Sequence, residues 1–86
     1  MPEISRFHGI VIRMYLDDHP PSHFHAHYAG HESQIAIQQP HLLNGMLRPR
    51  TLALVIEWAR LHQEELLENW HRLRHGRPAR RIAPLE

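Results

Sequence analysis

The longest stretch of the sequence without glycine or proline runs from Arg50 to His75. It is dominated by Leu, Ala, Glu, Arg and Gln, which have high intrinsic helix propensities. Pro49 suits the first position of a helix, and Gly76 suits the residue just after a helix C-terminus, with Pro78 preventing continuation. The sequence therefore predicts one long C-terminal helix that begins near residue 50 and ends near residue 75.

The chain before this helix shows the two-residue alternation of apolar and polar side chains that is typical of strands. Residues 3–7 and 10–16 are two such runs, separated by a His-Gly turn signal. The segment 41–48 contains Asn44-Gly45, which predicts a loop or a small extra hairpin. The pattern predicts the α+β class, with an antiparallel β-meander of three to four short strands and one long C-terminal α-helix packed on the sheet. Residues 1–76 would form this single domain, and residues 77–86 a basic tail.

A further hairpin is predicted around Ala29-Gly30, which reads as a two-residue turn. With that turn, Phe24 lies opposite Ile35, and the apolar faces of the two strands coincide. The same register places His25 opposite Gln34 and His27 opposite Glu32. His23, His25 and His27 then project from one face of their strand, away from Phe24.

The predicted helix carries two apolar stripes. A straight helix of this length would be about 39 Å long, whereas a globule of this size is about 30 Å across. The helix should therefore overhang, bend or contact something outside the domain. The main stripe suits packing on the sheet and comprises Leu52, Val55, Ile56, Ala59, Leu66, Trp70 and Leu73. Either the segment 41–48 covers the second stripe, or a second chain does; that stripe comprises Leu54, Trp58 and Leu61.

Composition restricts the chemistry. The 86 residues include no cysteine, so disulfides and thiolate metal sites are excluded. No apolar run approaches the roughly 20 residues needed to span a membrane, and the N-terminus lacks the features of a signal peptide. We therefore expect a cytoplasmic protein without a membrane partner. The ten histidines are an unusually large number, and a metal would have to use His, Asp or Glu.

The histidines of the 23–27 strand are the main candidate site. Side chains at i and i+2 lie roughly 6.7 Å apart on one strand face, so His23 and His25 could lean onto one metal ion. His19 or Asp18 from the preceding proline-rich loop could complete the set. His25 with His27 and Glu32 is an alternative set. Neutral imidazole with carboxylate suits Zn or another borderline divalent metal.

Three other interpretations of the histidines stay open. The strand face could simply be an exposed polar surface. Two imidazoles could also act without metal as general base and acid on a phosphodiester, as in a ribonuclease, with Arg6 or Arg13 stabilising the developing charge. His71 and His75 form an i, i+4 pair on the helix, which is a metal-capable spacing, although histidine in a last helical turn is also favoured by the helix dipole.

Arginines concentrate near the C-terminus, and all ten basic residues of the chain are arginine. Such a cluster could bind nucleic-acid phosphates or the acidic surface of a protein partner, or it could be a solvated tail. Its members are Arg72, Arg74, Arg77, Arg80 and Arg81.

Several segments resemble the small bacterial family known as domain of unknown function 4160. They are residues 4–15, residues 18–26 with their Asp-His-Pro-Pro-Ser-His-Phe-His-Ala sequence, and the helical segments 57–59 and 65–70. Members of the family resemble components of toxin–antitoxin-like gene pairs. The resemblance therefore implies an interaction or regulatory module that acts through a small partner protein from a neighbouring gene. A homodimer is the other expectation, because a domain of this size has a thin stability margin by itself. The resemblance singles out His19, His23 and His25 without assigning a catalytic residue. The alternative is a metal-binding or metal-independent hydrolase centred on the strand histidines.

Overall fold

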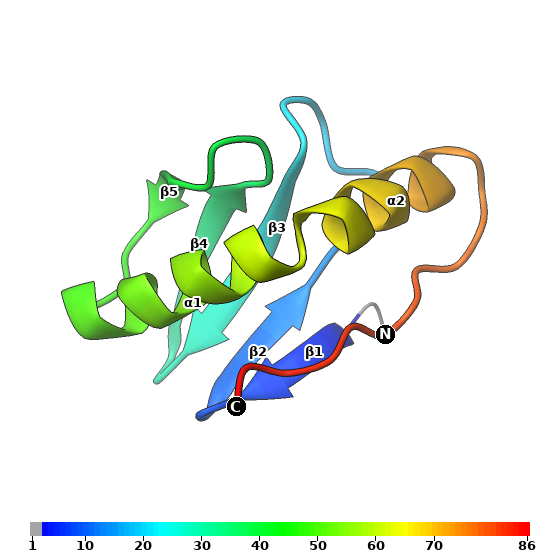
Figure 1. Ribbon diagram of the computed structural model, residues 1–86. Helices are drawn as coiled ribbons and strands as arrows, with labels where there is room; N and C mark the ends of the chain where they lie inside the picture. The colour runs from blue at the N-terminus through cyan, green and yellow to red at the C-terminus, as the bar shows by residue number, and fades with distance from the viewer. Residues whose placement is uncertain (1–2) are drawn as a thin grey trace.

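The computed structural model describes residues 3–86 and has the α+β architecture expected from the sequence. An antiparallel five-stranded sheet has the order β1-β2-β3-β4-β5, so each strand pairs with its sequence neighbour. Both helices cross the same face of this sheet (Figure 1). The strands are β1 (Glu3–Phe7), β2 (Ile10–Arg13), β3 (His23–Tyr28), β4 (His31–Ala36) and β5 (Leu42–Gly45), and the helices are α1 (Pro49–Leu61) and α2 (Gln63–Arg74).

The β3–β4 hairpin has the predicted register. Phe24 pairs with Ile35, His25 with Gln34 and His27 with Glu32. The turn residues Ala29 and Gly30 have φ angles of 52° and 82°. Positive φ at both central positions is the signature of the type I′ turn, whose twist matches that of the flanking strands.

The sheet has one strand more than the predicted three to four. β5 forms in the segment that contains Asn44-Gly45, and Asn44 pairs with Gln34 of β4. Gly45 has a φ of 87°, and a Cβ placed there would lie 2.3 Å from the Glu32 carbonyl oxygen. A glycine is therefore required for β5 to approach β4 so closely.

The single long helix predicted from the sequence is broken at His62. Its φ and ψ angles of −119° and 27° leave the helical region, and the Gln63 side chain donates a hydrogen bond to the Ile37 carbonyl oxygen at 2.9 Å. Trp58 and Trp70 would be about 120° apart around one straight helix, yet both are buried. With the break at His62, Trp58 of α1 and Trp70 of α2 are both part of the core, whereas Leu61 at the end of α1 stays exposed.

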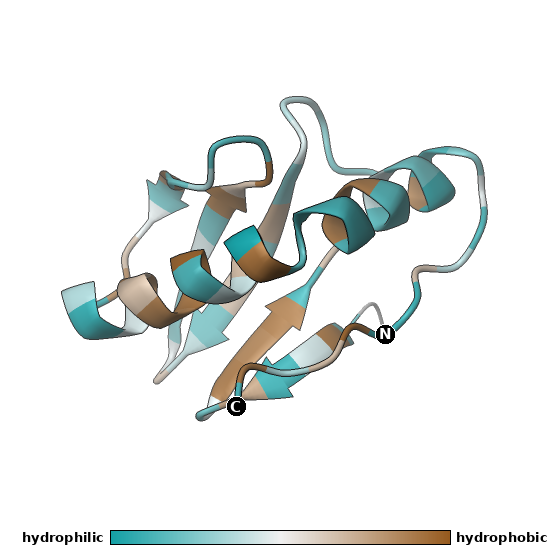
Figure 2. Ribbon diagram, viewed as in Figure 1, coloured by the Kyte–Doolittle hydropathy of each residue, from teal (hydrophilic) through white to brown (hydrophobic). Residues whose placement is uncertain are grey.

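The core lies between the sheet and the helices, where the apolar segments of β2 and of both helices meet (Figure 2). Trp58 is 0% exposed and packs against Phe7 and Phe24 at ring-centroid distances of 5.3 and 5.7 Å. The expectation that Trp58 contacts a second chain is therefore wrong. Leu54 packs against the core and is partly buried, and Leu61 is 66% exposed.

Residues 77–86 are not a free tail. After the loop that follows α2, their last part runs alongside β1 (Figure 1), and the Ile82 amide donates to the Ile4 carbonyl oxygen at 2.8 Å. Ile82 is buried, and the Trp58 indole Nε1 donates to the Ala83 carbonyl oxygen at 2.9 Å. Asn69 makes two hydrogen bonds to the Arg80 backbone. The C-terminal segment therefore closes one side of the core and covers the β1 edge, a docking that its basic composition does not predict.

Within residues 3–86, the structure has no helix with the length and apolar character required to cross a membrane.

Candidate metal centre

His23 and His25 lie on one side of β3 and are both buried, at 6% and 7% exposure. Phe24, on the other side of the strand, packs against Trp58 of α1. His23 lies at the start of the strand and also contacts the ring of Trp70 in α2, with 5.5 Å between ring centroids. The interpretation of this strand face as an exposed polar surface is therefore wrong for these two histidines.

The loop between β2 and β3 buries the two imidazoles. The Tyr15 ring meets the His25 ring edge-on, with 4.6 Å between centroids. The Tyr15 amide donates a 3.3 Å hydrogen bond to Asp18 Oδ2, and the Asp18 amide donates to the Tyr15 carbonyl oxygen at 3.4 Å. This local turn directs the Asp18 carboxylate toward the strand.

The Asp18 carboxylate faces both imidazoles. Asp18 Oδ2 lies 3.1 Å from His25 Nε2 and 3.6 Å from His23 Nε2. Around a tetrahedral zinc ion with bonds of about 2.0–2.1 Å, neighbouring ligand atoms are about 3.3–3.4 Å apart. The two observed distances lie on either side of that value. Across the described part of the chain, this is the one set of three or more His, Asp or Glu residues whose ligand atoms all lie within 4.8 Å of one another.

The second nitrogen of each imidazole is held by an acceptor. His23 Nδ1 lies 2.8 Å from the Pro21 carbonyl oxygen, and His25 Nδ1 lies 2.9 Å from Glu32 Oε2. Both acceptors take an N–H from Nδ1, which directs the two Nε2 atoms toward Asp18. An outer carbonyl or carboxylate that fixes the tautomer and ring orientation in this way is a regular feature of histidine metal sites.

The structure brings together three of the four predicted metal ligands. Asp18, His23 and His25 converge, whereas His19 is exposed and lies outside the cluster. In the alternative set, Glu32 does contact His25, but His27 Nδ1 is buried without a hydrogen-bond partner. Glu32 therefore orients a candidate ligand. Its diagonal position from His25 across the predicted hairpin was the sequence signal for that contact, whereas no pattern predicted the Pro21 carbonyl or Tyr15.

The cluster opens onto a groove of about 440 Å³, and Asp18 and His23 form part of its wall. Residues 17–21 of the β2–β3 loop line one side, and Gln34, Leu43 and Asn44 from β4 and β5 line the other. Asp18 and His23 therefore border this groove, whereas His25 does not line it.

Of the two arginines considered for metal-free catalysis, Arg6 forms an ion pair with Glu3. Its Nη2 lies 2.8 Å from Glu3 Oε1. The hydrogen bonds from Arg6, with a smaller contribution from Arg81, hold the pKa of Glu3 at about 2, below its ordinary value of 4.5. Arg13 pairs with His25 across β2 and β3, and its Nε is buried without a hydrogen-bond partner.

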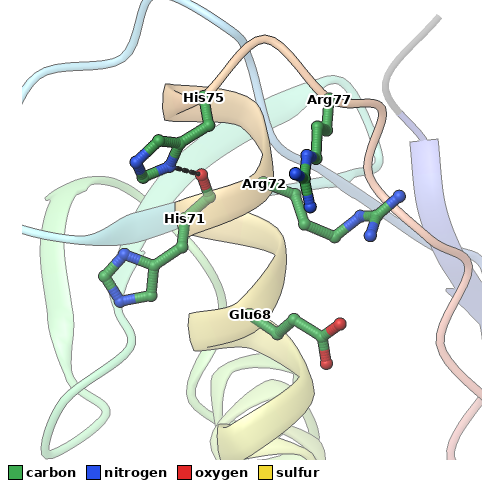
Figure 3. Close-up of a pocket in the computed structure, with 5 residues that line it drawn as sticks. All are labelled: Glu68, His71, Arg72, His75 and Arg77. Atoms are coloured by element: carbon green, nitrogen blue, oxygen red, sulfur yellow. Dashed lines mark hydrogen bonds between the residues drawn. The ribbon is translucent and has the colours of Figure 1, made fainter.

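Four of the five C-terminal arginines contact backbone or carboxylate oxygens of the described chain. Arg72 and Arg77 line a pocket of about 530 Å³ at the end of α2, together with Glu68, His71 and His75 (Figure 3). The His75 ring is held there by a hydrogen bond between its Nδ1 and the His71 carbonyl oxygen. Two arginines donate to backbone carbonyl oxygens: Arg72 Nε to Pro78, and Arg74 Nη1 to Asp18 at 3.4 Å. Two others lie near carboxylates: Arg80 is 3.9 Å from Glu68, and Arg81 is 3.3 Å from Glu3.

The fold and the site together define a small sheet-and-helix protein with a buried aspartate–histidine cluster at the mouth of a groove. The chain belongs to the family described as Domain of unknown function (DUF4160), whose model matches residues 9–71. The resemblance noted in the sequence is thereby confirmed. The matched range contains Asp18, His23, His25 and Glu32, and it ends before Arg74.

No curated protein and no solved structure matches the chain.

Proposed function

We propose that this protein binds a divalent transition metal ion of the zinc type through Asp18, His23 and His25. The observation that carries the proposal is the convergence of two buried imidazole Nε2 atoms on one carboxylate. Each ring is oriented by an acceptor at its other nitrogen. Two imidazoles and one carboxylate are a ligand set suited to zinc.

A hydrogen-bonded cluster explains this geometry less well than a metal site does. The 3.6 Å between His23 Nε2 and Asp18 Oδ2 is longer than a hydrogen bond. His25 has a carboxylate at each ring nitrogen, so without a metal both contacts can be hydrogen bonds only in its imidazolium form, which still leaves His23 Nε2 without a hydrogen bond to Asp18. A cation among the three residues would balance the carboxylate charge and occupy both free Nε2 lone pairs.

The same contacts argue against metal-independent acid–base catalysis. A general base must reach the substrate with a free nitrogen, whereas both Nε2 atoms point at Asp18 and both rings are more than nine-tenths buried. A metal with three protein ligands keeps a position for water or substrate and supplies Lewis-acid chemistry for hydrolysis. The adjoining groove would deliver the substrate to that position. We therefore favour a hydrolytic role over a purely structural one.

Titration of the untagged, chelator-treated protein with Zn²⁺ tests the proposal. We expect one equivalent bound per chain, with proton release and with affinity that falls at acidic pH, because histidine must be deprotonated to bind metal. Asp18→Asn should weaken binding, since a neutral amide replaces the only carboxylate among the ligands. Binding that is absent, or unaffected by Asp18→Asn, would refute the assignment.

We propose a second role, suggested by the family resemblance: a toxin–antitoxin-type module that binds a small partner protein. The open edge of β5 favours this role. β5 ends the sheet without a further strand among residues 3–86, whereas the C-terminal segment covers the β1 edge. Leu43 and Met46 are exposed beside the open edge, Met46 at 67%. Unpaired edge strands of this kind recruit a strand from another chain.

Co-purification with the product of the neighbouring gene tests this second role. A charge beside the edge should oppose strand addition, so Met46→Glu is expected to weaken the complex at least tenfold, or by about 1.4 kcal/mol. Leu61→Glu, on the exposed side of α1, is the control and should leave the affinity unchanged. If Leu61→Glu alone abolished the complex, the partner would bind at α1 and not at the β5 edge.

A further inference from the structure

Arg74 lies beside the candidate metal centre although it comes from the far end of the chain. Its Nη1 is 3.4 Å from the backbone carbonyl oxygen of Asp18. Its guanidinium carbon lies over the Trp70 ring, 5.4 Å from the centroid, and Trp70 in turn packs against His23. Two contacts therefore hold this cation next to residues that carry two of the three candidate ligands.

The guanidinium of Arg74 has donors to spare. An arginine has five N–H groups, and within residues 3–86 Arg74 makes a single hydrogen bond, which is long at 3.4 Å compared with about 2.9 Å for a typical N–H···O bond. The other contact is with the face of an aromatic ring, which leaves the planar edge accessible. This edge is the part of arginine that binds phosphate or carboxylate in a bidentate manner.

A second groove, of about 460 Å³, lies between Arg74 and the β2–β3 loop that carries Asp18. Asp18 and His19 line it on the loop side, and Arg74 lines it on the helix side. Leu16 and Leu73 provide an apolar wall. A divalent cation bound to Asp18 would neutralise that carboxylate. Of the charged residues that line the groove, Asp17 would then remain as a negative charge, and the metal ion and Arg74 would be positive. The balance favours an anion.

We propose that Arg74 is a substrate-positioning residue that binds the phosphoryl group of a phosphate ester at the metal centre. The inference rests on the proposed function, because the metal would supply the second anchor for the same phosphoryl group. A phosphate has oxygens to offer both to a metal and to a guanidinium fork. The apolar wall of Leu16 and Leu73 would contact the uncharged part of the ester.

Binding of phosphate esters to the Co²⁺-loaded protein tests the inference. The visible absorption of bound cobalt reports changes in its coordination, so each titration shows separately whether metal is bound and whether the ester reaches it. Phenyl phosphate represents small monoesters, and a diribonucleoside monophosphate represents nucleic-acid diesters. Phenol serves as the uncharged control.

We expect at least one of the two esters, but not phenol, to perturb the cobalt spectrum. Arg74→Gln should lower the affinity for that ester at least tenfold and leave the affinity for Co²⁺ unchanged. Arg77→Gln removes a neighbouring arginine from the separate pocket of Figure 3 and should bind the ester normally. Equal ester binding by Arg74→Gln and the unaltered chain, or no response to either ester with cobalt bound, would overturn the role of Arg74 alone. Failure to bind cobalt would overturn the metal centre and this inference together.

Discussion

Replacing Trp58 with alanine is expected to lower the free energy of unfolding by about 3–5 kcal/mol. Trp58 is fully buried and touches two aromatic rings of the sheet, Phe7 and Phe24. Its indole also holds the Ala83 carbonyl oxygen of the C-terminal segment. Because small domains have only about 5–15 kcal/mol of stability in total, this change should leave a substantial unfolded fraction. Urea unfolding followed by circular dichroism would measure it.

Two further variants separate the contributions of Trp58. Trp58→Phe keeps an aromatic ring and loses the hydrogen bond to Ala83, so we expect a loss nearer 1–2 kcal/mol. Leu61→Ala, on the exposed side of the same helix, should change stability by less than about 0.5 kcal/mol. A Trp58→Ala variant as stable as the unaltered chain would contradict the placement of Trp58 in the core and restore the interpretation of the helix as an interface.

Replacing His25 with alanine is expected to weaken zinc binding by more than about 100-fold. Loss of an outer-shell partner alone typically costs 10–100-fold, and His25 is a proposed direct ligand. Glu32→Gln removes only the carboxylate that orients His25, so its affinity should fall within that 10–100-fold range. Competition with a chromophoric chelator would measure both variants.

His75→Ala is the matched control for His25→Ala. It removes a histidine from the pocket at the end of α2, apart from the cluster, and should bind zinc normally. The reverse order of effects, with His75→Ala losing the metal and His25→Ala keeping it, would move the site to the His71–His75 pair. Circular dichroism of each variant separates loss of metal from loss of fold.

Local signals in the sequence predicted the turn, the strand register and the ends of the helical region, because these features are determined by residues close together in the chain. Ala29-Gly30 specified a two-residue turn, and the turn together with the alternation in the strands determined the register of Phe24 against Ile35. Pro49 and Gly76 bounded the helical region to within a residue or two. Each of these features depends on interactions among residues close together in the chain.

The features that sequence reasoning missed depend on distant contacts. His62 is not a helix-breaking residue type, yet the helix breaks there. Next to the break, the Gln63 side chain donates to the Ile37 carbonyl oxygen. The short segment of β5 is a strand through its pairing with β4, a contact that its own residues do not specify. The C-terminal segment reads as a basic tail, yet Ile82 and Ala83 bond to Ile4 and Trp58, which lie far from them in the sequence.

The candidate site divides in the same way. The i, i+2 spacing on one strand pointed to His23 with His25, but it pointed to His25 with His27 as well. The choice between Asp18 and His19 depended on the conformation of the β2–β3 loop, in which the Tyr15 amide bonds the Asp18 carboxylate. The proximity of Arg74 to Asp18 joins residues 56 positions apart, which no local pattern can predict.

Anomalous X-ray scattering at the zinc edge, from crystals of untagged protein grown with one equivalent of Zn²⁺, would locate the ion directly. We expect one peak per chain, bounded by Asp18 Oδ2 and by Nε2 of His23 and His25, with Glu32 still on the far nitrogen of His25. A peak between His71 and His75, or no peak in the folded chain, would show that the strand histidines do not hold a metal ion.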